Sequence, residues 1–425
     1  MRFLSILVNL DSVNVKGGRV TGDERLLTTA QVARRLQVKP ETVYAYVSRG
    51  LLHSVRDGPR RQSLFDPDEV DRLAERGRDG RTPSGVVERI HTELTLLDQD
   101  ELYYRGHPVA DLAGTWPIEA VAHLLWTGEL AAPPPFTALP ALLDVARAAL
   151  GALPGGIRLA DRVRVAVAAA GAADPLRYDI TPAAVVRRAE SLLAVLVDAL
   201  GPGPGAGDGP LAARLWPALT SRAATPAEVA LLDLVLVVLA DHDLAVSTVA
   251  ARVAASARAH PYAVVSAGLG ALDGPYHGAA TAPAHRFLGE ALVDPVRALS
   301  DRLRSGAPIP GFGHRIYRAR DPRAALIHAA LRDHPPAAAV VAAVDTVTAA
   351  LAGRAGAFPN VDLALAAAVH ALDLRPDAAE AVFALARTVG WIAHALEEYR
   401  GPGLRFRAEG VYTGRRPRRP AAPDR

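Results

Sequence analysis

Over most of the chain, hydrophobic and polar residues recur with the spacing of amphipathic helices. Three of the expected helices open at a proline, PIEAVAHLLWTGEL at Pro117, PAAVVRRAESLLAVLVDAL at Pro182 and PAEVALLDLVLVVLA at Pro226, and end at a glycine, proline or charged break. The run from Leu231 to Ala240 is apolar on most faces, as in a helix buried within a large core. Alternating strand patterns are nearly absent. The pattern predicts an all-α protein.

Two short helices separated by a tight turn are expected near the N-terminus. The first, TAQVARRL, is capped by Thr28 or Thr29, and the second, PETVYAYVSRG, has Pro40 at its first position and ends at Gly50. The apolar seam between them consists of Val32, Leu36, Val43 and Val47. A tight helix pair of this kind is typical of a helix-turn-helix.

The next segment, LLHSVRDGPRRQSLF, has the hairpin signal Asp57-Gly58 at its middle, and a third helix is expected from Pro67. Residues 26–76 therefore resemble the winged helix-turn-helix of the MerR and excisionase type. The resemblance implies DNA binding, and the alternative is a protein-docking or vestigial domain. Side chains expected at the major groove are Thr42, Tyr44, Ala45 and Arg49, and those expected at the phosphates are Arg56, Arg60 and Arg61.

Composition divides the chain into four stretches, of which one is the segment 26–76 described above. Residues 1–25 are not expected to be a secretory signal, because Asn9 and Asp11 interrupt their apolar run and no small-residue cleavage site follows. They are expected to form a disordered or strand-like extension, or to result from the choice of start codon. Residues 77–85, GRDGRTPSG, are a linker. Residues 86–425 form one helical part, since the same helical pattern resumes after each Gly- and Pro-rich loop.

The amino-acid composition narrows the class of protein. A length of 425 residues is enough for a large core, and the absence of cysteine excludes disulfides and thiolate sites, which fits a cytoplasmic protein. No uninterrupted apolar run is long enough to predict a membrane span. Histidines occur singly, so no metal site is expected. The net charge is only +3, but arginines cluster in the first part of the chain and in the tail RRPRR, which indicates an anionic partner.

Three loops between helices each present one titratable side chain. The loop PIPGFGHRIYRARDPR carries His314 among arginines, LDGPYHG carries His277, and FPNVD carries Asp362. Guanidinium groups suit ligands with carboxylates or phosphates, and glycines allow positive φ and a close approach of the backbone to a ligand. Taken alone, the first loop could equally be a solvated basic turn.

These three motifs, in this order and at these intervals, resemble citrate synthase. The similarity runs from about Gly85 to Gly414, begins with LDQDELYYRGHPVADLA and ends with RTVGWIAHALEE and VYTG. It implies the citrate synthase fold, with large and small helical domains, preceded by the small winged helix-turn-helix domain. It also implies an acyltransferase with oxaloacetate and an acyl-CoA as substrates, no separate cofactor, and a homodimer.

The resemblance also implies roles for individual residues. Asp362 would be the base that deprotonates the acetyl methyl group, with a pKa raised by its apolar helix, and His277 would donate to the thioester oxygen as a neutral imidazole near a helix N-terminus. His314 would polarise the ketone of oxaloacetate, and His242, in ADHDLAVSTVAARV, would contact the same substrate. The arginines that would bind its carboxylates are Arg323, Arg387 and Arg405, the last acting across a dimer.

For coenzyme A, the resemblance implies that the backbone around Gly311 and Gly313 receives the adenine and that Arg318 binds a phosphate. The chain departs from the family near its end, where LRFR replaces the usual Arg-Pro-Arg. Arg405 or Arg407 could therefore be the last clamp, and the order of the match favours Arg405.

The residues before Ser247-Thr248 also depart from the family, because Ala245 and Val246 stand where small polar residues are frequent, which bears on acyl specificity. The first hypothesis is citrate synthase, and a close variant is 2-methylcitrate synthase acting on propionyl-CoA. One methylene contributes only about 1 to 3 kcal/mol, so the sequence does not choose between them. The other hypotheses are a DNA-binding regulator whose synthase-like domain senses an acyl-CoA or citrate, and an enzyme that also binds DNA.

Overall fold

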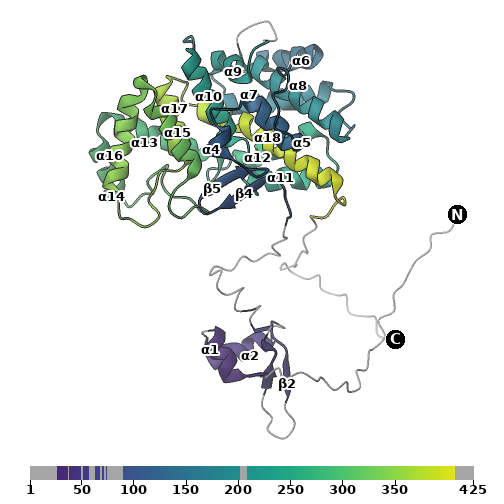
Figure 1. Ribbon diagram of the computed structural model, residues 1–425, viewed down its shortest axis with the longest axis vertical. Helices are drawn as coiled ribbons and strands as arrows, with labels where there is room; N and C mark the ends of the chain where they lie inside the picture. Colours follow the sequence, from purple (N-terminus) through teal and green to yellow (C-terminus); the bar gives the residue numbers. More distant parts are fainter. Residues whose placement is uncertain are drawn as a thin grey trace, which may run out of the picture. The chain divides into compact units, whose positions relative to one another are not determined.

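The computed structural model describes residues 26–36, 38–48, 51–56, 63–67, 69–70, 73, 90–201 and 208–406. Contacts divide the chain into two compact units, Met1–Glu88 and Arg89–Arg425. Helices dominate the described residues, as the hydrophobic pattern predicts (Figure 1). No described helix is both long enough and apolar enough to cross a lipid bilayer.

The described residues of the first unit form two helices and a small antiparallel sheet, and residues 67, 69–70 and 73 are also helical, at the position of the third helix predicted from Pro67. Helices α1 (Thr29–Leu36) and α2 (Pro40–Ser48) pack on strands β1 (Leu27–Thr28), β2 (Ser54–Arg56) and β3 (Ser63–Phe65), in the order β1-β3-β2. Val32 and Val43 are fully buried, and Leu36 and Val47 pack against the same cluster, so the predicted seam is confirmed. Strands β2 and β3 pair antiparallel, which confirms the strands of the wing.

Of the two candidate caps, Thr28 holds the start of α1. Its Oγ1 accepts from the N–H of Gln31 at 3.4 Å, and the Gln31 side chain accepts from the Thr28 N–H at 2.8 Å, which is a capping box. On α2, Thr42 is half-buried and Tyr44 is 58% exposed. Of the other residues expected to bind DNA, Arg49, Arg60 and Arg61 lie outside the described residues, as do the extension 1–25, the turn Asp57-Gly58 and the linker 77–85.

The second unit begins with a three-stranded sheet that the hydrophobic pattern did not predict. Strands β4 (Thr95–Asp98), β5 (Glu101–Tyr104) and β6 (His107–Pro108) pair antiparallel in that order. The two-residue turn between β4 and β5 has positive φ at Gln99 (48°) and Asp100 (61°), as tight hairpin turns require. No glycine marks this turn, which hid it in the sequence.

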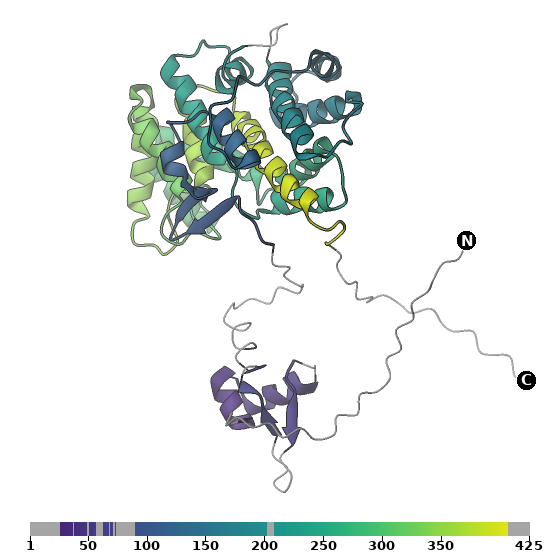
Figure 2. The same cartoon turned by 45° about the vertical axis from the view of Figure 1, so that its right-hand side comes forward.

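The helices of this unit form a larger and a smaller group, seen on opposite sides in Figures 1 and 2. The larger group comprises α4 (Val109–Leu112), α5 (Ile118–Thr127), α6 (Pro140–Gly151), α7 (Leu159–Ala173), α8 (Pro182–Leu200), α9 (Leu211–Leu219), α10 (Pro226–Leu239), α11 (Val246–Ser256), α12 (Pro261–Leu272) and α18 (Ala378–Arg400). The smaller group comprises the 3-10 turn η1 (Gly278–Ala280), α13 (Thr281–Val293), α14 (Pro295–Ser305), α15 (Pro322–Arg332), η2 (Pro335–Ala337), α16 (Ala338–Ala350) and α17 (Val361–Ala371).

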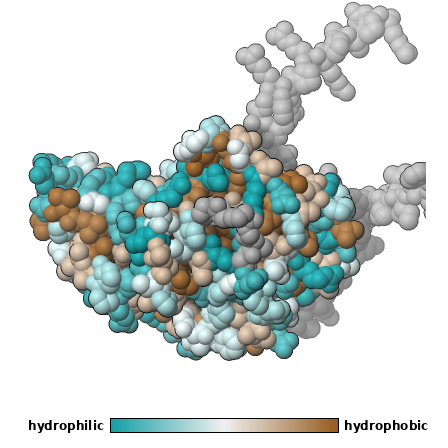
Figure 3. Space-filling model, turned by 90° about the horizontal axis from the view of Figure 1, so that it is seen from above, coloured by the Kyte–Doolittle hydropathy of each residue, from teal (hydrophilic) through white to brown (hydrophobic). Residues whose placement is uncertain are grey.

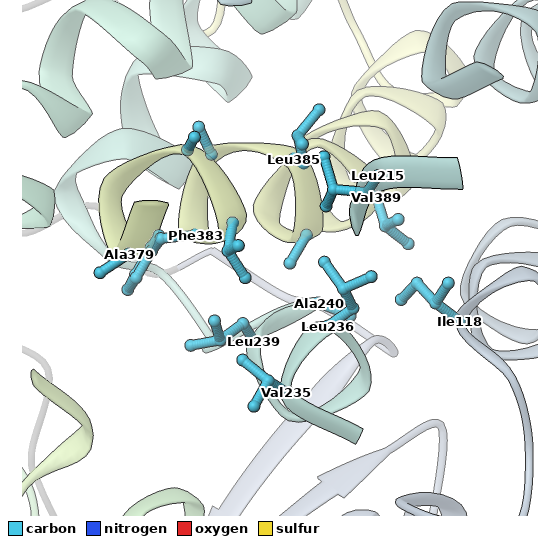
Figure 4. Packing of buried hydrophobic residues seen from close by; sticks show 14 of the residues in the cluster. Ile118, Leu215, Val235, Leu236, Leu239, Ala240, Ala379, Phe383, Leu385 and Val389 are labelled. Atoms are coloured by element: carbon cyan, nitrogen blue, oxygen red, sulfur yellow. The ribbon is translucent and has the colours of Figure 1, made fainter. Parts of the chain in front are cut away.

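The long helix α18 runs through the larger group and organises its core. Side chains of α10, such as Leu236 and Leu239, and of α18, such as Phe383 and Val389, gather in one buried cluster (Figure 4). On the face seen in Figure 3, hydrophilic and hydrophobic residues are interspersed over the described part of the surface. Burial of apolar side chains in this buried cluster is a main driving force for folding.

Candidate active site

The loop that carries His314 is joined to the corner that carries Asp362 by backbone hydrogen bonds. The N–H of Asn360 donates to the Gly311 carbonyl at 2.9 Å, and the N–H of Gly313 donates to the Phe358 carbonyl at 2.8 Å. The Asn360 side chain donates to the Gly313 carbonyl at 2.8 Å and also caps α17, because its Oδ1 accepts from the N–H of Asp362 at 3.0 Å. Two of the predicted functional corners are thus held together.

Gly311 and Gly313 have the expected positive φ, 81° and 78°. The crowding around them comes from the chain itself: a Cβ on Gly311 would lie 2.6 Å from the Leu363 Cβ, and one on Gly313 would lie 2.9 Å from the Gly356 carbonyl oxygen. At these two glycines the backbone also approaches α17 and the segment before it closely. Any larger residue would separate the two corners.

Arg323 is buried and held in one orientation by a bidentate ion pair with Asp321, with Nε to Oδ1 at 3.0 Å and Nη2 to Oδ2 at 2.8 Å. The same Asp321 carboxylate accepts from the N–H of Val361 at 3.0 Å. A pair of this geometry fixes the guanidinium as a planar donor. Asp321 therefore fixes both Arg323 and the start of the helix that carries Asp362.

His314 is a neutral imidazole whose Nε2 carries the proton. Its Nδ1 accepts from the N–H groups of Ile316 at 3.1 Å and Tyr317 at 3.3 Å, which leaves the proton on Nε2. Burial and the nearby Arg323 lower the pKa of His314 to about 4. The Arg323 Nη2 lies 3.3 Å from this Nε2, so two donors converge on one point. An oxygen of a bound anion would accept from both.

His242 is buried next to the same loop. Its Nε2 lies 2.9 Å from the hydroxyl of Tyr317, and its ring lies 5.5 Å from the ring of His314. Burial lowers the pKa of His242 well below its usual value, and Arg323 and Arg387 lower it further. The sequence did not single out Tyr317, although an aromatic residue inside an arginine-rich loop was the available signal.

The corner that presents His242 is fixed by buried polar side chains. The hydroxyl of Tyr104 donates to the Asp241 carbonyl at 2.9 Å, and the Asp241 carboxylate accepts from Thr95 and faces the His394 Nε2 at 3.3 Å. Gly390 of α18 packs here so closely that a Cβ would lie 2.6 Å from the Ala240 carbonyl oxygen. The packing leaves little freedom for the backbone beside His242.

His277 directly precedes the 3-10 turn η1, which leads into α13, so the expected position near a helical start is confirmed. Its Nε2 lies 2.7 Å from the hydroxyl of Ser247, which is fully buried at the start of α11. The His277 ring meets Phe383 of α18 edge to face at 5.8 Å. Burial, followed by Arg387 and Arg323, lowers the pKa of His277 to about 4, and the imidazole is therefore neutral.

Arg387 is a buried cation with incomplete hydrogen bonding. Its Nε donates to the Leu239 carbonyl at 2.9 Å and its guanidinium lies 4.8 Å from the Phe383 ring centre, but its Nη2 has no partner. Among the described residues, no carboxylate forms an ion pair with it. Burial lowers the pKa of Arg387 to about 10. A buried unpaired guanidinium is a ready site for an anion.

Asp362 lies in the first turn of α17, and no described residue forms a hydrogen bond with its carboxylate. Burial raises the pKa of Asp362 to about 6, although Arg323 opposes the shift. The raised pKa expected from the sequence is confirmed. A carboxyl group of this kind is ionised at neutral pH and basic enough to take a proton.

Two predicted ligand residues, Arg405 and Arg318, make contacts within this chain to residues other than the histidines, arginines and Asp362 described above. Arg405 donates from Nε to the Glu398 carboxylate at 2.8 Å, and Glu398 is also bound by Arg252 at 2.6 Å. Arg318 is exposed, and its backbone N–H donates to Asp100 at 3.1 Å. The role of Arg405 across a dimer stays a prediction. Its alternative, Arg407, lies outside the described residues.

No group of three or more His, Asp or Glu side chains is arranged to hold a metal ion within the part of the chain that the structure describes. The charged side chains of the site are two guanidinium groups, Arg323 and Arg387, and two carboxyl groups, Asp321 and Asp362, accompanied by three neutral imidazoles. Groups of these kinds can bind anions and transfer protons.

Comparisons with known proteins define the family. The profile described as "Citrate synthase, C-terminal domain" matches residues 85–407, and that of a helix-turn-helix domain matches residues 26–78. A citrate synthase of Acidithiobacillus ferridurans is 30% identical over 362 residues, which cover 75% of this chain and 90% of that protein. The 2-methylcitrate synthase 2 of Corynebacterium glutamicum is 29% identical and has the same coverage of both chains, 75% and 90%.

Solved structures agree in fold. Citrate synthase from Pyrobaculum aerophilum has a TM-score of 0.67 at 25% identity, over 79% of this chain and 93% of that one. The Thermoplasma acidophilum citrate synthase, solved as a ternary complex with carboxymethyl coenzyme A and oxaloacetate, has a TM-score of 0.65 at 23% identity, over 80% and 97%. The class is that of acyltransferase enzymes. The chain belongs to the citrate synthase family and carries a helix-turn-helix domain at its N-terminus.

Proposed function

We propose that the protein is a citrate synthase, which joins the acetyl group of acetyl-CoA to oxaloacetate and hydrolyses citryl-CoA. The observation that carries this proposal is the convergence of two buried guanidinium groups, Arg323 and the unpaired Arg387, on neutral histidines beside a carboxyl group with a raised pKa. Oxaloacetate has two carboxylates and a ketone, which match these groups in kind.

In the proposed first step, Asp362 takes a proton from the methyl carbon of the thioester. The hydroxyl of Ser247, 2.7 Å from His277 Nε2, holds the neutral ring with its proton on Nδ1, which donates to the thioester oxygen as negative charge develops there. A neutral imidazole suits this role because it can share its N–H proton in a hydrogen bond without first being deprotonated.

In the proposed second step, the enol carbon attacks the ketone carbon of oxaloacetate. A carbon–carbon bond forms, the carbonyl π pair moves to oxygen, and His314 donates its Nε2 proton to that oxygen. Arg323 and Arg387 hold the carboxylates, and His242 contacts the same substrate. Water then cleaves the thioester, which gives citrate and free coenzyme A. Coenzyme A is a substrate in this cycle and no separate cofactor is involved.

The remaining assignments complete the proposed site. The Gly311 to Gly313 backbone receives the adenine of coenzyme A, and Arg318 binds one of its phosphates. We assign a homodimer in which Arg405 reaches the partner's substrate. The packed pair α11 and α12 supports an interface, because its exposed residues include Val253, which is 43% exposed, and the small residues Ser266 and Gly270.

A second candidate is 2-methylcitrate synthase, which acts on propionyl-CoA. It is favoured by relatives of both names at nearly equal identity and by Val246, which is 61% exposed directly before Ser247. An apolar side chain beside the acyl group would accept the additional methyl.

We further propose that residues 26–76 bind DNA, supported by the winged helix-turn-helix architecture and the exposed Tyr44 on α2. A regulator that senses an acyl-CoA or citrate without turnover is the alternative, and the full set of acid–base groups favours an enzyme. The lack of cysteine supports placing the protein in the cytoplasm.

The test is release of free coenzyme A thiol from acetyl-CoA or propionyl-CoA, with and without oxaloacetate. Release that depends on oxaloacetate supports the proposal, and the ratio of the two kcat/KM values decides between the two synthases. No release from folded protein with either thioester would favour the regulator.

A further inference from the structure

The segment that follows His314, residues 315–320, has little hydrophobic packing to fix its backbone. Tyr317 is the one buried side chain among these six residues, and the others are exposed. The five successive backbone N–H groups of residues 316–320 are nevertheless all bound by side chains. Polar contacts therefore hold this segment in place.

The acceptors for these N–H groups are the imidazole of His314 itself and the carboxylate of Asp100. The N–H groups of residues 316 and 317 donate to His314 Nδ1 at 3.1 and 3.3 Å. Those of residues 318, 319 and 320 donate to Asp100, the first to Oδ1 at 3.1 Å and the other two to Oδ2 at 2.9 and 3.3 Å. Because the two sets are consecutive, a shift of residues 318–320 would pass directly to the N–H groups that orient the imidazole.

Asp100 suits this role through both its backbone and its side chain. It lies in the turn between β4 and β5 with a positive φ of 61°, which Gly, Asn and Asp adopt more readily than other residues. The N–H groups of Ala319 and Arg318 lower the pKa of Asp100, so the carboxylate is ionised at neutral pH. The turn thus presents a charged acceptor to a loop that is 218 to 220 positions away in the sequence.

The β4–β5 hairpin is also fixed to the corner that presents His242. The hydroxyl of Tyr104 on β5 donates to the Asp241 carbonyl at 2.9 Å, and Thr95 on β4 donates to the Asp241 carboxylate. Strand β5 contacts α4 of the larger helical group and α15 of the smaller one (Figure 1). One short hairpin therefore holds the backbone beside both His242 and His314, whose rings lie 5.5 Å apart.

Close packing contributes little to the contact between the hairpin and the loop. A cavity of about 240 Å³ lies beside it, bounded by β5, α4 and the start of α15, and its lining includes Glu101, Arg320 and Arg323. Glu101 and Arg320 form an ion pair, but both side chains are largely exposed, and such pairs contribute little. The three hydrogen bonds to Asp100 are therefore the main restraint on residues 318–320.

We propose that Asp100 is a positioning residue for the reaction: its carboxylate fixes residues 318–320 and, through them, the orientation of the His314 imidazole relative to His242. The restraint on the loop is independent of the function proposed above, whereas its effect on catalysis rests on that function.

Three variants of the full-length protein isolate the carboxylate from the turn. Asp100→Gly removes the carboxylate and keeps a residue that adopts positive φ, and Asp100→Asn keeps one acceptor oxygen and tolerates the same φ. The matched control is Gln99→Gly, since Gln99 lies in the same turn with a φ of 48° and is exposed.

The first measurement is amide hydrogen exchange, resolved to single residues, without substrates. In Asp100→Gly the amides of residues 316–320 should exchange about tenfold faster or more, while those of α17 stay as in wild type, and Gln99→Gly should match wild type throughout. Unchanged exchange at residues 318–320 would overturn the proposal. Faster exchange at 318–320 with 316 and 317 unchanged would overturn the link to His314. Faster exchange throughout both helical groups would show a general structural role instead.

The second measurement is the steady-state rate of thiol release that depends on oxaloacetate. The value of kcat/KM for oxaloacetate should fall about 10-fold to 100-fold in Asp100→Gly, by a smaller factor in Asp100→Asn, and not in Gln99→Gly, because a misplaced His314 polarises the ketone poorly. A wild-type value in Asp100→Gly, or equal losses in the two Asp100 variants, would contradict the positioning role. If the synthase assignment were wrong, wild type would show no turnover with oxaloacetate while the exchange result stood.

Discussion

Replacing Arg387 by methionine should make the unliganded protein more stable while abolishing oxaloacetate binding. Burial lowers the pKa of Arg387 from the usual high value of a guanidinium to about 10. At ~1.4 kcal/mol for each pKa unit, the buried charge costs ~3 kcal/mol. Loss of the hydrogen bond to the Leu239 carbonyl costs ~1 kcal/mol, which leaves a net gain of ~2 kcal/mol.

The stability gained by Arg387→Met depends on pH in a defined way. At neutral pH the guanidinium is protonated in both the folded and the unfolded chain, so the full cost is present in the wild type. This free-energy cost decreases only as pH rises past about 10, where Arg387 in the folded protein begins to lose its proton. The gain from Arg387→Met should therefore be constant across the neutral range.

The assay is urea unfolding at fixed protein concentration and neutral pH, followed by a signal from the larger unit. The matched control is Arg188→Met, since Arg188 is also buried but pairs with Asp174 at 2.8 Å. Removing one partner of a buried pair should cost about 3 to 5 kcal/mol. A loss of similar size in Arg387→Met would refute the view that this cation lacks a partner.

Repeating the unfolding experiment with oxaloacetate present gives a second test of Arg387. Oxaloacetate at about 100 times its Kd should stabilise wild type by ~2.7 kcal/mol and should leave Arg387→Met unchanged. Equal stabilisation of both proteins would show that Arg387 does not hold the substrate.

Asp362→Asn should lower kcat by about 100-fold to 10,000-fold. In the wild type, kcat/KM should rise with pH through about 6 as the Asp362 carboxyl loses its proton. A kcat/KM that does not change with pH would exclude Asp362 as the base. Tyr317→Phe keeps the ring but removes the hydroxyl that lies 2.9 Å from His242. Initial rates should show that KM for oxaloacetate rises about tenfold while KM for acetyl-CoA is unchanged. Equal shifts in both KM values would count against a role of Tyr317 at the oxaloacetate site. Ser247→Ala should lower kcat about tenfold and leave oxaloacetate binding intact, because only the orientation of His277 is lost; weaker oxaloacetate binding in a titration would contradict this.

The sequence predicted those features that depend on neighbouring residues. Prolines at the first helical positions, as at Pro182 and Pro226, marked helix starts, and the FPNVD corner placed Asp362 in the first turn of a helix. The raised pKa of Asp362 followed from the apolar run behind it. Local rules of this kind need no knowledge of tertiary packing.

Features that depend on distant residues were not predictable in this way. Tyr317 meets His242 across 75 positions of sequence, and Arg405 meets a Glu398 that Arg252 already binds. The β4–β5 hairpin was missed because Gln99 and Asp100 adopt positive φ without a glycine, while Asp100 accepts from backbone N–H groups of a remote loop. Tertiary contacts decided the local structure in each case.

The central claim is that this site forms a carbon–carbon bond. The most direct test is to incubate the protein with oxaloacetate and acetyl-CoA labelled with carbon-13 at the methyl carbon, and to follow the label by NMR. We predict that the label appears in a methylene carbon of citrate as free coenzyme A accumulates. Label found only in acetate, at the same rate with and without oxaloacetate, would contradict the account, because it would show hydrolysis of the thioester without condensation.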